Sequence, residues 1–250
     1  MNIFTFLYNE VLFRPLFNLL VGVTNILPTH SVGVAIIIVT FITRLILLPS
    51  AWHHAKQLQK NQGKMADLQR ELKVIQEKHK NDKAKKAEAT MALYKKSGIN
   101  PASGCLPLLI QLPILLALYR VFFIGLGPET FQHLYPFVSS PATLQSSFLG
   151  IPLSNPSLLL AILAGIAQFI QMRFFTPTPP SSPGLNESSE QMMASMQRNM
   201  MYIFPVMTVF ISLQLPAALA LYWLVSTILA IGQQYIIKKR LHLTTTPSTI

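Results

Sequence analysis

One apolar run near the start of the chain carries a single charge at membrane depth, and it limits what the chain can fold into. The run, SVGVAIIIVTFITRLILLPS, covers residues 31–50, and its charged residue is Arg44. A bilayer core about 30 Å thick needs roughly 20 apolar residues in a helix, so this run is long enough to span it. An arginine in such a helix raises the free energy of membrane insertion by at least about 2.5–3.5 kcal/mol. Two interpretations stay open: the guanidinium reaches the surface near Pro49, or the charge has a function.

The composition of the whole chain indicates an integral membrane protein. Of its 250 residues, 51% are hydrophobic and only 12% are charged, well below the charged share of a soluble domain. The single cysteine, Cys105, excludes a disulfide framework and a multi-cysteine metal site. The N-terminus has neither the features of a cleaved signal peptide nor those of an organelle transit peptide. We therefore expect it to be retained, in a bacterial plasma membrane.

Five apolar segments are predicted to span the bilayer as helices, which makes the chain an all-α integral membrane protein. These segments are residues 31–50, 105–126, 157–175, 201–215 and 217–237. The loop at 127–155 contains no lysine or arginine, whereas basic residues occur in the segment 51–100, the connector 176–200 and the tail 238–250. The positive-inside rule therefore places the N-terminus outside the cell and the C-terminus in the cytoplasm.

Residues 1–30 are predicted to form an amphipathic helix that lies in the membrane interface. Four polar residues lie close to one face of this otherwise apolar helix: Glu10, Arg14, Asn18 and Asn25. A narrow polar stripe of this kind suits an interfacial helix, and a first spanning helix is the competing interpretation. Pro28 then breaks the helix, and Ser31 can cap the span that follows.

The segment 51–100 is predicted to be a basic, cytoplasmic, antiparallel helical hairpin. It contains twelve of the chain's twenty lysines and arginines, against five acidic residues. Apolar residues repeat at heptad spacing in two sets, which are Leu58, Met65, Leu68, Leu72 and Ile75, then Ala84, Ala87, Met91 and Tyr94. The sequence HKND at 79–82 separates the two registers, so we expect two helices that pack as a coiled coil. A single solvated helix is the alternative.

The motifs that the sequence lacks exclude several classes of function. It contains no P-loop, no HExxH zinc motif and no nucleophile elbow. No aspartate or glutamate lies inside a predicted span, so proton-coupled transport and intramembrane hydrolysis lack the groups they normally use. We therefore expect no enzymatic activity, no catalytic residue, no metal and no cofactor.

Several polar residues nevertheless lie at membrane depth. The candidates for a shared site are Arg44, Gln111, Gln168, Gln171, Gln214, Tyr222 and Trp223. Each glutamine alone suits hydrogen bonding between helices. Together with an arginine that has no carboxylate in any span, they favour a water-containing cavity, because an unpaired guanidinium needs water or several acceptors. Arg120 and Arg173 lie near span ends, where we expect them to reach the surface.

Three separated motifs resemble those of YidC-type membrane protein insertases, the family that includes mitochondrial Oxa and chloroplast Alb relatives. They are ITRLILLP at 42–49, NPASGCLPLLIQLPILLALYRVF at 100–122 and FPVMTVFISLQLPAALALYWLVSTI at 204–228, in the family's order. The resemblance extends over about residues 30–240. It implies a membrane protein insertase and chaperone, which integrates nascent membrane proteins and helps them fold without ATP.

The resemblance also implies roles for individual residues. Arg44 would lie in a hydrophilic groove open to the cytoplasm and the lipid but closed on the outside. Trp223 and a glutamine of the third span, either Gln168 or Gln171, would line it, and the segment 51–100 corresponds to the family's cytoplasmic coiled-coil loop. The implied partners are nascent membrane proteins and the lipid bilayer. The ribosome and the Sec translocon stay open as further partners, and no specific nucleic acid is expected.

The sequence is expected to represent the minimal bacterial form of this family, without a large periplasmic domain or a lipoprotein signal. Its C-terminal tail is short, which weakens the case for the ribosome tethering that long basic tails provide. Two other functions are kept as alternatives: a small anion channel or transporter that uses Arg44, and a structural assembly factor. The substrate range, the dependence on Sec and the oligomeric state do not follow from the sequence.

Overall fold

The computed structural model is mostly helical, and it describes residues 6–79, 82–98, 106–124, 130–141, 143–175 and 187–245. The first half of the chain forms η1 (Tyr8–Phe13, a π-helix), α2 (Arg14–Ile26), α3 (Val32–Ile46), α4 (Leu48–Lys78) and α5 (Lys83–Ser97). The second half forms α6 (Leu106–Ile124), η3 (Phe131–His133), β1 (Ser147–Phe148), β2 (Ile151–Pro152), α7 (Leu158–Phe175), α8 (Glu187–Leu213) and α9 (Ala217–Thr245).

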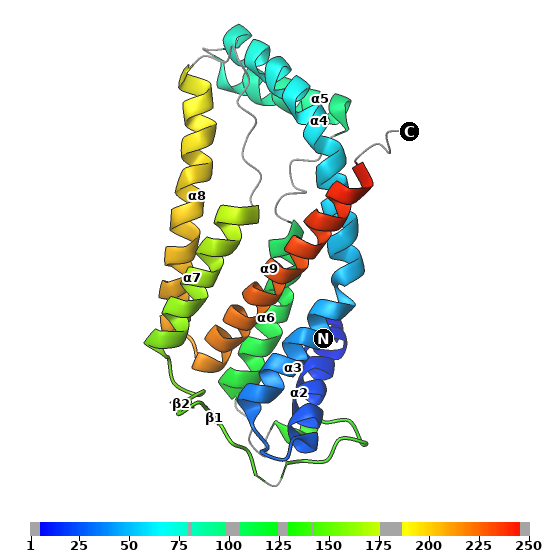
Figure 1. Cartoon of the computed structure of the whole chain (residues 1–250), viewed down its shortest axis with the longest axis vertical. Helices are drawn as coiled ribbons and strands as arrows, with labels where there is room; N and C mark the ends of the chain where they lie inside the picture. Colours follow the sequence, from blue (N-terminus) through cyan, green and yellow to red (C-terminus); the bar gives the residue numbers. More distant parts are fainter. Residues whose placement is uncertain are drawn as a thin grey trace.

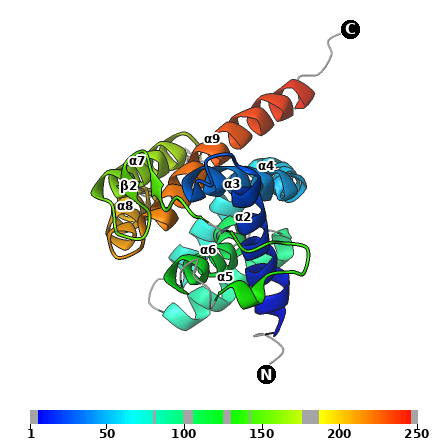
Figure 2. The same cartoon turned by 90° about the horizontal axis from the view of Figure 1, so that it is seen from below.

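Helix α9 lies between two groups of helices. It packs against α7 on one side and against α3 on the other, while α8 packs on α7 and α2 packs on α3 (Figures 1 and 2). The pair α4 and α5 lies at the same end of the molecule as the C-terminal part of α9, and the short hairpin of β1 and β2 lies at the opposite end (Figure 1). The basic pair α4 and α5 and the connecting segment that has no lysine or arginine are therefore separated along the long axis of the molecule.

The lengths of the apolar helices agree with only some of the five predicted membrane spans. Among the described residues, one helix is long and apolar enough to cross a bilayer by itself, the section of α9 from Ala217 to Arg240. Helix α3 and the start of α4 (Leu48–Gln57) are together long and apolar enough to form a second span, although the chain bends by 50° between them. Shorter apolar helices occur at Gln111–Phe122, Leu158–Phe174 and Met201–Leu213. The topology of five spans stays a prediction.

The two ends of α3 have identifiable causes. The hydroxyl of Ser31 accepts a hydrogen bond from the backbone N–H of Val34 at 3.5 Å, as expected for a helix cap. At the other end the helix stops at Ile46, and the chain bends at Leu47 into α4. Pro49 lies in the first turn of α4, where its missing N–H costs no helical hydrogen bond. The proline therefore starts a new helix with a different direction.

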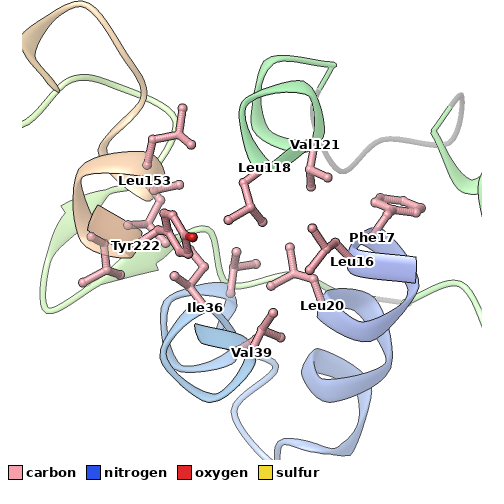
Figure 3. Packing of buried hydrophobic residues seen from close by; sticks show 14 of the residues in the cluster. Leu16, Phe17, Leu20, Ile36, Val39, Leu118, Val121, Leu153 and Tyr222 are labelled. Carbon is pink, nitrogen blue, oxygen red and sulfur yellow. The ribbon is translucent and has the colours of Figure 1, made fainter. Parts of the chain in front are cut away.

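The main hydrophobic core fills the half of the bundle that ends at β1 and β2. Figure 3 shows side chains of α2, α3, α6 and α9 converging there, together with one loop residue: Leu16, Phe17, Leu20, Ile36, Val39, Leu118, Val121, Tyr222 and Leu153. Phe17 and Leu20 are completely buried. The apolar face of α2 is therefore covered by protein, and the large buried side chains fix α2 to the bundle.

The polar stripe of the first helical segment binds the loop that follows α6. The Asn18 side chain donates to the His133 carbonyl at 3.0 Å, and it accepts from the Tyr135 backbone N–H at 2.6 Å. Arg14 also donates to the His133 carbonyl, at 3.2 Å, and Asn25 donates to the Ser139 carbonyl at 2.7 Å. The stripe thus holds a loop in place, and the interfacial position of this helix stays a prediction.

The side chain of Arg120 was expected to reach the surface, but in the structure it contacts η1. Its guanidinium donates a hydrogen bond to the side-chain oxygen of Asn9. Its Cζ atom also lies 4.4 Å from the centre of the Phe13 ring, which is a favourable cation–π distance. Arg120 is therefore partly buried and joins α6 to η1. Arg173, by contrast, is exposed near the end of α7, as expected.

Helices α4 and α5 pack against each other around a small core. Leu68, Leu72 and Leu93 are buried in it, with Ile75 and Tyr94 at its edge. In the second helix the predicted register agrees with the structure at Tyr94 and is wrong at Met91, which is 65% exposed, and at Ala84, which is also exposed. The side chains of Leu58, Met65 and Ala87 lie outside the described residues. The cytoplasmic position of this pair stays a prediction.

The turn between α4 and α5 falls where HKND predicts a break. Helix α4 ends at Lys78, and Asp82 caps α5 by accepting from the backbone N–H of Lys85 at 3.0 Å. This hydrogen bond lowers the pKa of the Asp82 carboxyl, because it favours the ionised form. The cap is consequently formed above the ordinary pKa of aspartate, and it is lost as the pH falls through the lowered value.

A close contact between α7 and α8 generates a prediction about stability. A Cβ atom on Gly165 would overlap with Cγ2 of Val209, whereas a Cβ atom on Gly232 of α9 would meet nothing within 4 Å. We expect Gly165→Ala to lower the free energy of unfolding by about 1–3 kcal/mol through overpacking. The same change at Gly232 should not lower it, because alanine favours a helix over glycine. Thermal unfolding of both variants in detergent measures this, and equal shifts would contradict it.

Candidate functional site

The polar side chains of the apolar helices gather around the first half of α9. Tyr222, Trp223 and Ser226 of this helix meet Arg44 of α3, Gln111 of α6 and Gln168 of α7. Because α9 lies between α3 and α7, residues on its two sides contact different helices. The contacts divide into two groups, one centred on Arg44 and the other on Trp223.

Arg44 is bound by a neutral partner. Its Nε and Nη2 atoms both donate to the Ser226 hydroxyl, at 3.2 Å and 2.6 Å respectively. Ser226 is buried, with 3% of its surface exposed, and Arg44 is partly exposed. Within the part of the chain that the structure describes, no carboxylate forms an ion pair with Arg44. The positive charge is therefore hydrogen-bonded without being neutralised.

A chain of polar groups continues from Ser226 to α6. The Tyr222 hydroxyl lies close to both Ser226 and Arg44, and it accepts a hydrogen bond from the Gln111 side chain at 2.5 Å. Tyr222 is itself almost fully buried. Arg44 and Ser226 thus form one hydrogen-bonded pair, Gln111 and Tyr222 form a second, and the two pairs lie next to each other. The four side chains come from three helices, and each buried polar group has a partner, as stability requires.

The second group lies between α9 and α7. The Trp223 ring N–H donates to the Gln168 side-chain oxygen at 3.3 Å, and the Gln168 amide donates to the Gln171 oxygen at 3.4 Å. Gln168 is buried, whereas Gln171 is partly exposed. Gln168 is therefore the glutamine in direct contact with Trp223, and Gln171 is connected to it through the spacing of three residues on one helix face.

Gln214 lies apart from both groups. It is exposed in the turn between α8 and α9, where its backbone N–H donates to the Ile211 carbonyl at 3.0 Å.

Ser226 was not among the site residues expected from the sequence. Its position four residues after Tyr222, on the same face of one helix, is the signal that could have identified it.

The surroundings of the site are closed towards one end of the molecule and apolar along its side. Towards β1 and β2, Tyr222 lies in the buried core of Figure 3, next to Leu153 and Ile36. Along the side, α7 and α8 expose large apolar residues, which include Ile162, Ile166, Val206 and Phe210. Many large exposed apolar residues on two neighbouring helices are typical of contact with lipid or with another apolar partner.

Within the described residues, no group of histidine, cysteine, aspartate and glutamate side chains could hold a metal ion. The site consists of one arginine, amides, hydroxyls and an indole. It has no side chain of the kinds that act as a general base or a nucleophile, apart from the neutral hydroxyls. The arrangement can hydrate or bind a polar or anionic group beside an apolar surface.

Comparison with known proteins identifies the family. A family model described as 60Kd inner membrane protein matches residues 24–244. A relative from Fusobacterium nucleatum, named membrane protein insertase YidC, is 36% identical over 210 residues, which are 83% of this chain and 86% of the relative. A relative of the same name from Oceanobacillus iheyensis is 34% identical over 237 residues, which are 93% of this chain and 84% of the relative.

Some relatives of that name are considerably longer than this chain. The one from Pelagibacter ubique is 36% identical over 245 residues, which are 93% of this chain but only 40% of the relative. The matched region of the family model includes Arg44, Ser226 and the other residues of both polar groups. The resemblance seen in the three sequence motifs is thereby confirmed, and the chain belongs to the 60Kd inner membrane protein family.

Proposed function

We propose that this chain is a membrane protein insertase of the bacterial plasma membrane, which integrates nascent membrane proteins and helps them fold. The shared name of its relatives supports this function. The observation that carries the mechanism is the guanidinium of Arg44 at membrane depth, held by the neutral hydroxyl of Ser226. Its charge is available to a polar segment of a substrate, because no described carboxylate neutralises it.

The barrier that such a protein lowers is one of desolvation. An apolar segment of a nascent chain gains free energy in lipid, but the polar segment next to it loses hydration when it crosses the hydrocarbon. A groove that holds water, Arg44 and the amides of Gln168 and Gln171 replaces part of that hydration. The membrane potential, negative inside, favours outward movement of negative charge by about 2.3 kcal/mol per charge per 100 mV. Insertion then requires no ATP, and the sequence has no P-loop.

The packing around the site supports a groove that is open on one side only. Buried residues such as Leu219 and Leu153 fill the space between Tyr222 and the end that carries β1 and β2. The exposed apolar faces of α7 and α8 offer the substrate an exit into lipid. An anion channel, the alternative function for Arg44, would need a continuous polar path through that packed end.

The proposed topology has five spans, with the N-terminus outside and the C-terminus in the cytoplasm. It is supported by the position of the basic pair α4 and α5 at the same end as Lys238, Lys239 and Arg240 of α9 (Figure 1). The loop at 127–155, which has no lysine or arginine, connects helices at the other end. The basic pair is well placed to capture a nascent chain, and the ribosome and the Sec translocon are further candidate partners on that side.

The role of Arg44 can be tested with two substrates that differ only in the charge of the translocated tail. We expect Arg44→Ala to reduce insertion of a substrate with an acidic tail about tenfold, because hydrogen bonds to charged groups contribute about 1.5–3 kcal/mol. A neutral tail should be affected much less. Arg44→Lys keeps the charge and should retain most of the activity. Insertion into proteoliposomes measures this, with the exposed Arg173→Ala as the control.

Equal losses for the acidic and the neutral tail would remove Arg44 from the electrostatic mechanism. An unchanged yield for both tails would leave the insertase function without a role for this charge. A selective ion current through reconstituted protein, combined with no insertion of a single-span substrate, would favour the anion channel instead.

Thiol labelling tests whether the polar groups face one groove. We expect cysteines at Gln111, Gln171 and Trp223, in a variant with Cys105 replaced, to react with a membrane-impermeant reagent from the cytoplasmic side only. Cysteines at the exposed apolar positions Leu163 and Phe210 should stay unreactive, because a thiol in lipid does not ionise. Labelling in vesicles of both orientations measures this. Reaction from both sides would support a channel, and no reaction from either side would identify a dry structural network.

A further inference from the structure

We propose that Ser226 is a positioning residue for Arg44, which keeps the guanidinium inside the groove with one edge free for an acidic group of the substrate. This inference rests on the proposed insertase function and adds a residue that the sequence motifs did not single out. The observation behind it is the pair of hydrogen bonds from Nε and Nη2 of Arg44 to one buried hydroxyl. No other partner of Arg44 with hydrogen-bond geometry is found among the described residues.

The geometry of the two bonds determines which part of Arg44 stays available. A guanidinium has five N–H groups, and Ser226 accepts from the edge formed by Nε and Nη2. The opposite edge keeps both Nη1 hydrogens and one on Nη2. Two parallel N–H groups of this kind match the two oxygens of a carboxylate. Ser226 therefore orients the side chain without occupying the edge that recognises an anion.

The neutrality of Ser226 matters as much as its position. An aspartate at this place would also hold Arg44, but it would cancel the positive charge that attracts an acidic segment. A serine hydroxyl satisfies two N–H groups and leaves the charge intact. The Tyr222 hydroxyl lies close to Ser226 on the other side, and it accepts a hydrogen bond from the Gln111 side chain of α6.

Ser226 also decides between the two interpretations of Arg44 that the sequence leaves open. Arg44 lies two residues before the end of α3, and the side chains of Leu45 and Ile46 are exposed. A long arginine side chain in this position is able to reach the nearby surface. Two hydrogen bonds to a buried acceptor on another helix favour the inward rotamer instead. Without Ser226, we infer, the guanidinium moves to the surface and its effect in the groove is lost.

The test compares two buried hydroxyl residues that are neighbours in the sequence. Ser226 and Thr227 are each 3% exposed, but only Ser226 is bonded to Arg44. In proteoliposomes, we expect Ser226→Ala to lower insertion of the substrate with the acidic tail about tenfold relative to the neutral tail. We expect Thr227→Ala to leave the ratio of the two substrates within about twofold of the parent protein, since an effect on packing alone does not depend on tail charge.

A double variant distinguishes positioning from a separate structural role. If Ser226 acts through Arg44, Ser226→Ala should cause no further loss in the Arg44→Ala variant. Additive losses would overturn the proposal. So would a Ser226→Ala variant that affects both tails equally while Arg44→Ala is selective for the acidic tail, and this result would leave the insertase mechanism intact. If Arg44→Ala is itself not selective, the electrostatic part of the proposed function fails first.

A spectroscopic measurement tests the geometry independently of insertion. With arginine labelled by 15N, the Nε–H signal of Arg44 should exchange with water at least about tenfold more slowly in the parent protein than in Ser226→Ala, because a hydrogen bond in a buried site protects it. The Thr227→Ala protein, which should unfold at a similar temperature, serves as the control. Equal exchange rates in the parent and Ser226→Ala proteins would show that Ser226 does not hold the side chain, whatever the insertion assay gives.

Discussion

The two hydrogen bonds from the Arg44 guanidinium to the Ser226 hydroxyl are the interaction on which the rest of the site depends. A charge in an apolar bundle must be neutralised, hydrated or hydrogen-bonded, because an isolated ion in a low-dielectric medium is very unfavourable. Here the described partner is neutral and lies on α9, the helix that also contacts α7. The same contact therefore attaches α3 to the centre of the bundle and preserves a positive charge beside Tyr222 and Gln111. Neutralisation by a carboxylate would have given a more ordinary structural ion pair.

Much of this arrangement follows from local features of the sequence. Several helices start or end at caps, at a proline or at the HKND break, because such residues act on their immediate neighbours. These residues include Ser31, Pro49 and Asp82. Arg44, Gln111, Gln168 and Trp223 could be selected because polar residues in apolar helices are rare and costly. Ser226 could not be selected on this ground. A serine in an apolar helix can bond its own backbone and is therefore common, so that only the position of Arg44 on another helix gives it a role.

The features that the sequence did not predict depend on contacts between distant segments. Asn18 binds His133 and Tyr135, which lie more than a hundred positions further along the chain, and a polar stripe looks the same whether it faces lipid headgroups or a loop. The register of α5 was predicted only in part, for a related reason. Alanine and methionine at heptad positions are compatible with either face of a short helix, and the packing of Leu93 on Leu68 and Leu72 decides which face is buried. Gln214 was selected because it lies within the predicted span 201–215. In the structure it follows the end of α8, and the turn there exposes it.

The asymmetry of the bundle connects these contacts to the proposed mechanism. Large side chains of α2, α3, α6 and α9 fill the half that ends at β1 and β2, and the bonds of Asn18 and Arg14 hold a loop over that end. The polar groups begin where this core stops. A substrate segment that enters from the other end can therefore reach Arg44 but meets a packed core beyond it, and the exposed apolar faces of α7 and α8 offer a lower-energy path than further movement along the axis. In the proposed mechanism, insertion into lipid without an open pore therefore follows from the position of the core relative to the charge.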